Sequence, residues 1–247
     1  MLIIAIVASE LGKAVSKETR VDILVTPLVT IFSGVGLSML IAAPIGAAAS
    51  QVGTLIMWAT EQAPLVMGIL VSVIVGVALT LPISSAAICA ALGLTGLAGG
   101  AAVAGCCAQM IGFAVMSYKE NGVGGLVSQG LGTSMLQMGN IVKNPRIWIA
   151  PTLASAITGP LATCVFHFEM NGAAVSSGMG TCGLVGQIGV YTGWVSDIAA
   201  GTKAAITPMD WAAMVLLCFV LPAVLSVIFC EIERKLGWIK EGDLKLN

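Results

Sequence analysis

Residues 66–82 read VMGILVSVIVGVALTLP, and what this stretch lacks decides the fold of the chain. It has no charged residue and no regular alternation of apolar and polar positions. A strand of a membrane β-barrel would alternate over about ten residues, whereas a helix crossing the hydrocarbon core needs about 20 mostly apolar residues. The stretch therefore predicts a membrane-spanning helix, extending roughly from Pro64 to Pro82.

The rest of the chain has the same character. Its 247 residues are 57% hydrophobic and 9% charged, its mean hydropathy is +1.01, and an ordinary soluble domain is about a quarter charged. The pattern predicts an all-α, polytopic integral membrane protein in which residues 1–247 form one membrane-embedded domain. The net charge of −1 without a basic stripe gives no indication of nucleic-acid binding. The charge-free windows are 23–60, 62–118, 121–142, 147–166, 170–196 and 211–230.

Basic residues flank the first and last of these windows. Lys13, Lys17 and Arg20 precede the first, and several lysines and an arginine follow the last. Because cytoplasmic loops carry an excess of Lys and Arg, we expect both termini in the cytoplasm of a multi-pass protein of the plasma membrane. Segment 83–118 exceeds one crossing and is short for two, so it stays unassigned, and we expect about six to eight membrane segments in all. Four spans receive a direction that is consistent with this rule: 23–44, 64–82, 147–166 and 211–230.

The two ends of the chain are short. Residues 1–9, MLIIAIVAS, are apolar but too few to span, and a charged stretch follows up to residue 22. This pattern is typical of the end of a helix whose beginning is missing, so we expect an N-terminally shortened chain. Residues 231–247 form a short cytoplasmic tail, too short to fold as a separate domain.

Two glycine-rich segments, 121–140 and 172–193, interrupt the apolar pattern. Both carry amide side chains, and they share the similar words GLVSQ (125–129) and GLVGQ (183–187). Irregular backbone at membrane depth requires burial in protein or a wet cavity, and paired interrupted segments indicate a transporter's binding site. We therefore predict two broken or re-entrant helices. Close helix packing through glycine is the alternative.

Glycines recur at positions 180, 183, 186 and 189. If this stretch is helical, a three-residue period leaves a groove without side chains along the helix surface. Such a groove would admit either another helix or a ligand.

Polar residues at the edges of apolar windows are the candidates for binding a solute. His167, the only histidine, and Glu169 follow the span 147–166, and ionisable groups near the membrane interior are costly and often functional. A carboxylate accepts hydrogen bonds from solute hydroxyls, and amides offer both donors and acceptors. Interfacial hydration of the charged groups and helix-to-helix hydrogen bonding by the amides are the alternatives. The remaining candidates are Gln109, Gln129, Gln187, Ser84 and Ser85.

Catalytic and metal chemistry is not indicated. The sequence has no GxSxG, HExxH or P-loop motif. Its cysteines form no CxxC pair, and we interpret them as small hydrophobic residues of the helices. No catalytic residue, cofactor or metal is expected. The cysteines are at positions 89, 106, 107, 164, 182, 218 and 230.

Several sequence motifs of this chain resemble those of a known family. LTLPISSAAI (79–88), GCCAQMIGFAV (105–115) and NPRIWIAPTLAS (144–155) are the most specific, and the likeness extends from Glu10 to about Tyr191. The chain resembles bacterial sugar transporters of the phosphotransferase system (PTS), membrane component IIC. The resemblance implies sugar translocation, phosphoryl transfer from separate IIA and IIB proteins, and a homodimer in the lipid bilayer.

Three hypotheses follow for the function. The first is the permease subunit of a PTS-type transporter that binds a small polar solute, a carbohydrate, and moves it by alternating access. At most it would be the translocating subunit of a sugar phosphotransferase. The second is a PTS-independent transporter or channel for a small solute. The third is a non-transporting membrane scaffold or sensor in which the glycines serve helix packing.

Overall fold

A computed structural model of the chain describes residues 2–16 and 22–246, and its regular structure in these ranges is helical. The coordinates divide into two compact units, Met1–Gln51 and Val52–Asn247. The first unit contains α1 (Leu2–Val15) and most of α2 (Asp22–Gln62). The second contains the remaining elements, from α3 to α11, and carries every residue predicted to bind solute. A single domain over 1–247 stays a prediction.

Helix α2 continues well beyond the span predicted for 23–44, because it ends only at Gln62. Residues 46–51 contain three consecutive alanines, Ala47 to Ala49. Alanine is the best helix former, and the helix continues through this stretch although Pro44 and Gly46 lie at the expected end.

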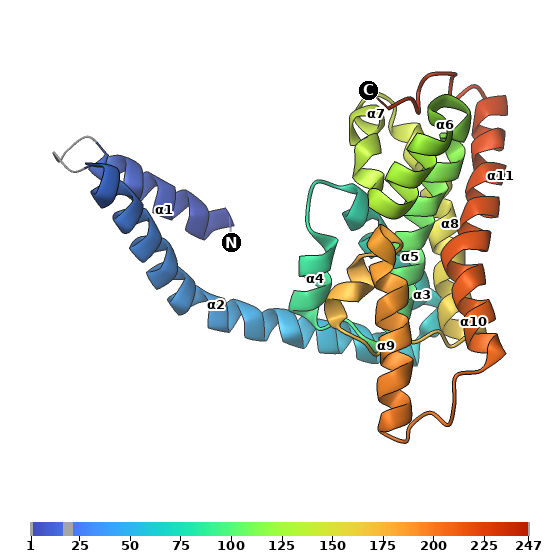
Figure 1. The fold of residues 1–247 in the computed structure, drawn as a ribbon, viewed down its shortest axis with the longest axis horizontal. Coiled ribbons are helices and arrows are strands. Elements are labelled where there is room, and N and C mark those ends of the chain that lie inside the picture. Colours follow the sequence, from blue (N-terminus) through green and yellow to red (C-terminus); the bar gives the residue numbers. More distant parts are fainter. Residues whose placement is uncertain (1, 17–21, 247) are drawn as a thin grey trace. The chain divides into compact units, whose positions relative to one another are not determined.

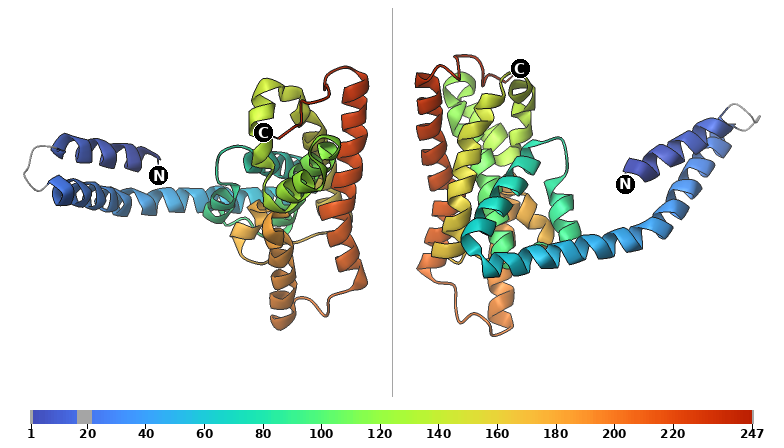
Figure 2. Two further views of the ribbon diagram at one scale, coloured as in Figure 1. Left: turned by 45° about the horizontal axis from the view of Figure 1, so that its top comes forward. Right: turned by 180° about the vertical axis from the view of Figure 1, so that it is seen from behind.

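Helix α5 (Gly96–Met116) is the centre of the second unit. It packs against α3 (Pro64–Thr80), α8 (Ile149–Pro160) and α11 (Leu221–Lys235), as Figures 1 and 2 show. Nearly every residue from Ala98 to Met116 is buried. A helix that is apolar all round is a buried helix, and its many glycines and alanines let three neighbours approach closely.

A close approach of three helices is at Gly105, where α3, α5 and α8 meet. A Cβ atom on Gly105 would collide with the carbonyl of Ser72 on α3. Ser72 Oγ donates to Ser155 O of α8 at 2.8 Å, and Ser155 Oγ donates to Gly105 O at 3.3 Å. Small residues at a helix contact, joined by serine hydrogen bonds, are typical of membrane proteins.

The predicted all-α, polytopic membrane fold is confirmed. In the described ranges, three helical stretches are long and apolar enough to cross a membrane: Gly96–Met116, Pro145–Val165 and Pro208–Lys235. The last two lie where spans were predicted for 147–166 and 211–230. Pro145–Val165 joins η3 (Pro145–Trp148), α8 and η4 (Leu161–Val165), and Pro208–Lys235 joins α10 (Pro208–Val215), η7 (Leu216–Val220) and α11. The total of six to eight segments stays a prediction.

The unassigned segment 83–118 is a short helix followed by a full span. Helix α4 (Ser85–Leu92) ends at Gly93, which has φ 64°, and α5 begins at Gly96, which has φ 63°. Glycine adopts this left-handed backbone without strain. The two glycines therefore separate a half-length helix from the buried span.

Both glycine-rich segments are broken helices, as predicted. The first consists of α6 (Tyr118–Val127), the π-helix η1 (Ser128–Gly132), the 3₁₀ turn η2 (Ser134–Gln137) and α7 (Met138–Lys143). We call residues 118–143 the interrupted element. The second consists of two 3₁₀ turns, η5 (Ala174–Gly178) and η6 (Cys182–Leu184), before α9 (Val185–Ala199).

The predicted glycine groove along 180–189 is wrong. Gly180 and Gly183 both have φ 53° and lie outside the helix, which begins only at Val185. Added Cβ atoms at Gly186 and Gly189 would collide with Gly180 O and the Ser176 side chain. The three-residue period thus reflects two left-handed turns and two close contacts, and no open groove runs along this stretch.

The contact at Gly105 generates a test of the packing. We expect Gly105→Ala to destabilise the protein by about 1–3 kcal/mol, because the new methyl group forces α3 and α5 apart. The measurement is the thermal unfolding midpoint in detergent. Gly139→Ala is the matched control, since a Cβ atom there meets nothing within 4 Å; equal midpoints for the two variants would contradict the role of Gly105.

Candidate functional site

A polar cavity of about 490 Å³ lies where the loop after η4, the end of α9 and the start of α10 come together. It is at the end of the second unit opposite the C-terminal tail (Figure 1). His167 and Glu169, two of the predicted binding residues, are in its wall. The lining is Phe166, His167, Phe168, Glu169, Asn171, Trp194, Asp197, Thr202, Lys203, Met209, Asp210 and Ala213.

The side chains of the loop 166–171 alternate between buried and exposed. Phe168 and Met170 are buried in the apolar cluster around α5, whereas His167 and Glu169 are exposed. Burial of the two apolar side chains anchors the loop, and the two exposed polar residues line the cavity.

Glycines of α5 fix the position of this loop. Met170 exchanges two backbone hydrogen bonds with Gly96, each 3.0 Å long, and a Cβ atom on Gly100 would collide with Phe168 O. His167 has φ 44°, a left-handed conformation that is unusual for a residue other than glycine. Such strained positions cluster at ligand sites.

Two carboxylates share one amide donor in the cavity. Asn171 Nδ2 donates to Glu169 Oε2 at 3.1 Å and to Asp197 Oδ2 at 2.9 Å. Two like charges are thereby held together by a neutral group. Each ionised carboxylate has about four acceptor positions, so both keep the capacity to accept further hydrogen bonds from a ligand.

A second group of interacting side chains, around Lys203, also lines the cavity. Lys203 Nζ is 2.7 Å from Asp210 Oδ1 and 5.4 Å from the centre of the Trp194 ring. Asp210 Oδ2 accepts from Thr207 N and Oγ1, and this capping box begins α10. The cation is therefore held by an ion pair and by the face of an aromatic ring.

The charge of the cavity is negative, because three carboxylates face one lysine. The charges of Lys203 and Asp210 cancel in their ion pair. The net negative charge therefore comes from Glu169 and Asp197. The arrangement favours a neutral or cationic ligand with hydrogen-bond donors and disfavours an anion. Within the described ranges, no three of His, Cys, Asp and Glu form a metal-binding group.

Ser84 and Ser85 lie away from the polar cavity. They line a second cavity of about 390 Å³, together with Thr133 and Met135 of the interrupted element. Ser84 Oγ accepts from Ala87 N at 3.1 Å and caps α4, and Ser85 Oγ donates to Gly178 O at 2.7 Å. Met179 and Cys182 of the second broken segment complete this cavity, so both broken segments contribute to its wall.

Gln109 is completely buried and connects helices. Its Oε1 accepts from Trp148 Nε1 at 3.0 Å and from Thr80 Oγ1 at 3.3 Å, and its Nε2 donates to Thr152 Oγ1 at 3.3 Å. These contacts use the donors and acceptors of the amide within the protein. Binding of solute by Gln109 stays a prediction.

Gln129 and Gln187 differ in how far their amides are satisfied. Gln129 donates to Ser117 Oγ at 2.7 Å and accepts from Gln137 Nε2 at 2.9 Å. Gln187 donates to Cys107 Sγ at 3.2 Å, but its buried Oε1 has no partner among the described residues. Solute binding stays a prediction for both, and only Gln187 has a buried acceptor left over.

Sequence reasoning did not select Asn171, Asp197, Lys203 and Asp210. A signal for Asp197 was present, since Glu169 and Asp197 border the charge-free window 170–196 from its two sides. Charges at both borders of one window mark the same membrane surface only if the window turns back or crosses twice. That depends on the course of the broken segment, which the sequence pattern does not give.

Broken helices beside polar cavities are typical of membrane carriers. The family model described as phosphotransferase system, EIIC, matches residues 1–246, and the chain belongs to this family. It is therefore a membrane-embedded permease subunit of the phosphotransferase system, a class of protein that works with IIA and IIB components. Searches of curated proteins and of solved structures find no significant match.

The shared donor of the cavity generates a test. We expect Asn171→Ala to destabilise the protein by about 1 kcal/mol, because the carboxylates of Glu169 and Asp197 lose the amide between them. The thermal unfolding midpoint measures this effect. Ser196→Ala, an exposed position one residue from Asp197, is the control; a midpoint for Asn171→Ala equal to that of the control would show that the amide does not stabilise the pair.

Proposed function

We propose that the polar cavity around Glu169 and Asp197 binds the solute of this permease, and that the solute is an unphosphorylated carbohydrate. One observation carries the proposal: two carboxylates held by a single amide, with acceptor positions to spare. The hydroxyl groups of a sugar are hydrogen-bond donors that match these acceptors.

The negative charge of the cavity favours binding of the free sugar over binding of the phosphorylated sugar. A phosphorylated sugar would bring negative charge toward Glu169 and Asp197, which like-charge repulsion disfavours. A site at this end therefore suits uptake of the free sugar, whereas phosphorylation by a separate IIB component belongs to the opposite end. The elements that line the cavity, the end of α9 and the start of α10, lie at the end of the second unit opposite the C-terminus (Figures 1 and 2).

The second cavity, lined by both broken segments, is the basis for proposing alternating access. Both broken segments line it, through Thr133 and Met135 on one side and Met179 and Cys182 on the other. Carriers move such discontinuous helices around a site near the middle of the membrane. Displacement of the interrupted element would then open a path past Ser84 and Ser85. The homodimer implied by the family is part of the same proposal.

Binding of a sugar predicts a gain in thermal stability. A ligand at a hundred times its dissociation constant stabilises the native state by about 2.7 kcal/mol. We expect at least one neutral sugar of a panel to raise the unfolding midpoint of the purified protein. The same sugar phosphorylated should have no effect.

Two variants locate the site in this experiment. Glu169→Gln and Asp197→Asn should lose most of the stabilisation, because each replaces an acceptor-only group with one that also donates. Glu241→Gln, at an exposed position of the tail, should keep it. Stabilisation by non-sugar metabolites alone would favour the PTS-independent transporter, and a folded protein indifferent to the whole panel would favour the scaffold.

The proposed orientation has its own test. With both termini in the cytoplasm, the polar cavity faces outward. In a Cys164→Ser background, which removes the exposed native thiol, we expect an impermeant maleimide to label Thr202→Cys in intact cells. Glu241→Cys should be labelled only after permeabilisation, and the reverse pattern would invert the topology.

A further inference from the structure

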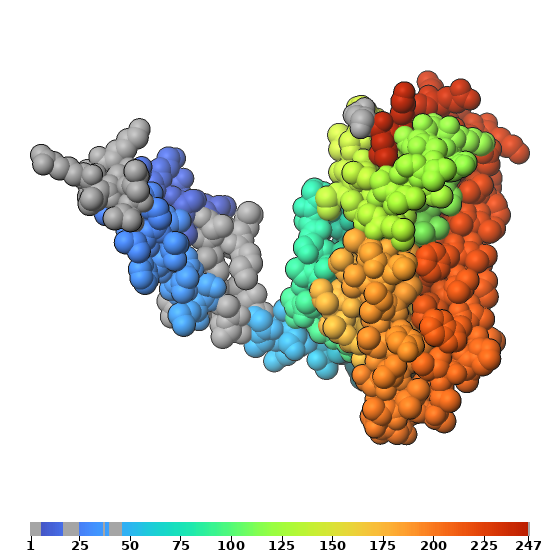
Figure 3. Space-filling model, in the orientation of Figure 1, coloured from blue at the N-terminus to red at the C-terminus, as the bar shows by residue number. Residues whose placement is uncertain are grey.

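The C-terminal tail, residues 236–246, folds back over the end of the helical bundle. In the space-filling view its dark-red atoms lie against the green and yellow-green atoms of α6 and α7 (Figure 3). Ile239 and Leu244 are 3% and 0% exposed and belong to a cluster with Phe113, Ile141 and Ile147. The remaining tail residues are mostly exposed, so these two apolar side chains anchor the segment.

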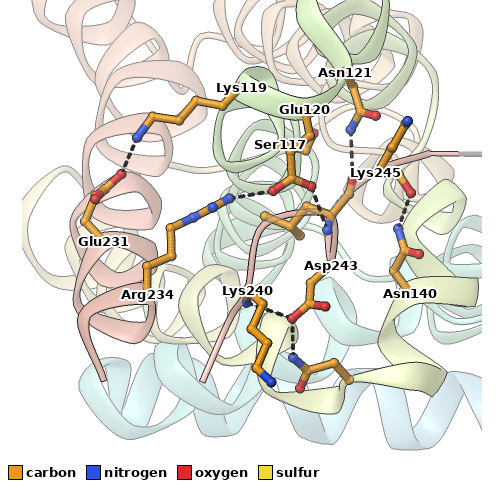
Figure 4. Close-up of polar contacts among 12 residues, drawn as sticks. Ser117, Lys119, Glu120, Asn121, Asn140, Glu231, Arg234, Lys240, Asp243 and Lys245 are labelled. Carbon is orange, nitrogen blue, oxygen red and sulfur yellow. Dashed lines mark hydrogen bonds and ion pairs between the residues drawn. The ribbon is translucent and has the colours of Figure 1, made fainter. Parts of the chain in front are cut away.

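Side chains near and within the interrupted element hold the backbone of the tail. Asn121 Nδ2 donates to Leu244 O and Asn121 Oδ1 accepts from Leu246 N, both at 2.8 Å. Asn140 Nδ2 donates to Lys245 O at 2.9 Å. Figure 4 shows the contact between Asn140 and Lys245. The asparagines thus supply the donors and acceptors that a neighbouring strand would otherwise provide.

A chain of amide hydrogen bonds connects the tail with the π-helix. Gln129 Nε2 donates to Ser117 Oγ, and Gln137 Nε2 donates both to Gln129 Oε1 at 2.9 Å and to Leu244 O at 2.9 Å. Asn140 Nδ2 donates to Gln137 Oε1 at 2.7 Å. These side chains are buried. Displacement of Leu244 would therefore leave buried amides without partners, which is costly.

Glu120 joins the tail to α11 as well. Its Oε1 accepts from Arg234 Nη2 at 2.9 Å, and its Oε2 accepts from Leu244 N at 2.8 Å (Figure 4). The two side chains of the ion pair are only 16% and 10% exposed. A neighbouring pair, Lys119 and Glu231, is 2.8 Å apart. One carboxylate thus fixes the beginning of α6, the end of α11 and the tail together.

The interrupted element has little intrinsic stability. Gly122 has φ 59° and ψ −156° inside α6, and α7 is only 6 residues long. Isolated helices shorter than about 12–15 residues are marginal. The arrangement of this element must therefore come from contacts outside it, and hydrogen bonds to the backbone of the tail are among these contacts.

We propose that residues 236–246 act as a clasp that sets the conformation of the interrupted element. With the clasp docked, the amide chain from Ser117 to Leu244 is complete and the π-helix and 3₁₀ turn are held. With the clasp released, the element rearranges, and Thr133 and Met135 move with it in the wall of the second cavity. The clasp stands independently of the proposed function, whereas its use as a gate rests on that function.

Hydrogen–deuterium exchange of the full chain in lipid nanodiscs tests the clasp. Leu244→Asp places a charge in the apolar anchor site and should release the tail. We expect amide exchange in residues 122–143 to accelerate at least tenfold, with exchange in 96–116 unchanged, because local opening is confined to the weaker region. Glu241→Ala, an exposed tail residue, is the matched control and should exchange like the wild type.

A milder variant covers the case in which Leu244→Asp does not fold. Asn121→Ala with Asn140→Ala keeps both apolar anchors but removes the hydrogen bonds of the two asparagines to Leu244, Leu246 and Lys245. It should accelerate exchange in both the tail and 122–143. Faster exchange of the tail with wild-type exchange in 122–143 would overturn the proposal, because the tail would then be a passive cover.

The role of the clasp as a gate is tested separately, by the sugar-dependent rise of the unfolding midpoint together with the rate of sugar uptake into vesicles. If the clasp variants keep sugar stabilisation but change the rate of uptake into vesicles, the clasp is a gate. If uptake is unchanged while exchange in 122–143 is faster, the clasp exists but does not gate transport. Absence of sugar stabilisation in the wild type would defeat the proposed function and leave the exchange result standing.

Discussion

The second unit depends on the complete burial of α5. Its glycines and alanines let α3, α8 and α11 approach so closely that backbone carbonyls stand where side chains would otherwise be, as at Gly105 against Ser72. In a membrane no hydrophobic force drives helices together, and close van der Waals packing with interhelical hydrogen bonds takes that role. The same small residues at the beginning of α5 receive the loop that carries His167 and Glu169, so the packing of the span also positions the polar cavity.

Interrupted backbone in such a protein requires polar partners, and the buried amides supply them. Gln109 ties Trp148 and Thr152 to α5, and Gln129 with Gln137 secures the π-helix of the interrupted element. An unsatisfied polar group in the hydrocarbon region costs several kcal/mol. Gln129 and Gln137 donate to backbone carbonyls, those of Gly125 and Leu244. Gln109, in contrast, bonds only side chains of neighbouring segments. Gln187, whose buried Oε1 lacks a partner in the described part of the chain, is the exception.

The two ends of the second unit differ in their chemistry. At one end the carboxylates of Glu169 and Asp197 keep acceptor positions available inside a cavity. At the other end the carboxylate of Glu120 is fully engaged, with Arg234 on one oxygen and the tail backbone on the other. One end is suited to receiving a ligand with donor groups, and the other is closed by the chain itself. This asymmetry is the basis of the proposed recognition of the solute at one end and its phosphorylation at the other.

The sequence by itself determined the class of fold and the location of the breaks. Long charge-free windows leave no alternative to buried or lipid-facing helices, and the glycines and amides of 121–140 and 172–193 marked the segments that are broken. These features are local, since hydropathy and backbone freedom act over a few residues. The words quoted from 79–88, 105–115 and 144–155 also identified the family.

Only the tertiary structure decided which polar residues meet. Glu169 and Asp197 are neighbours through Asn171, whereas Gln109, Gln129 and Gln187 belong to separate contacts. The repeated glycines at 180 and 183 look helical by spacing, but both adopt a left-handed backbone before α9 begins, and Gly180 lies directly against Cys106 of α5. Contacts between residues far apart in the chain depend on how the breaks direct each segment, and that direction is set by packing against neighbours and not by local composition.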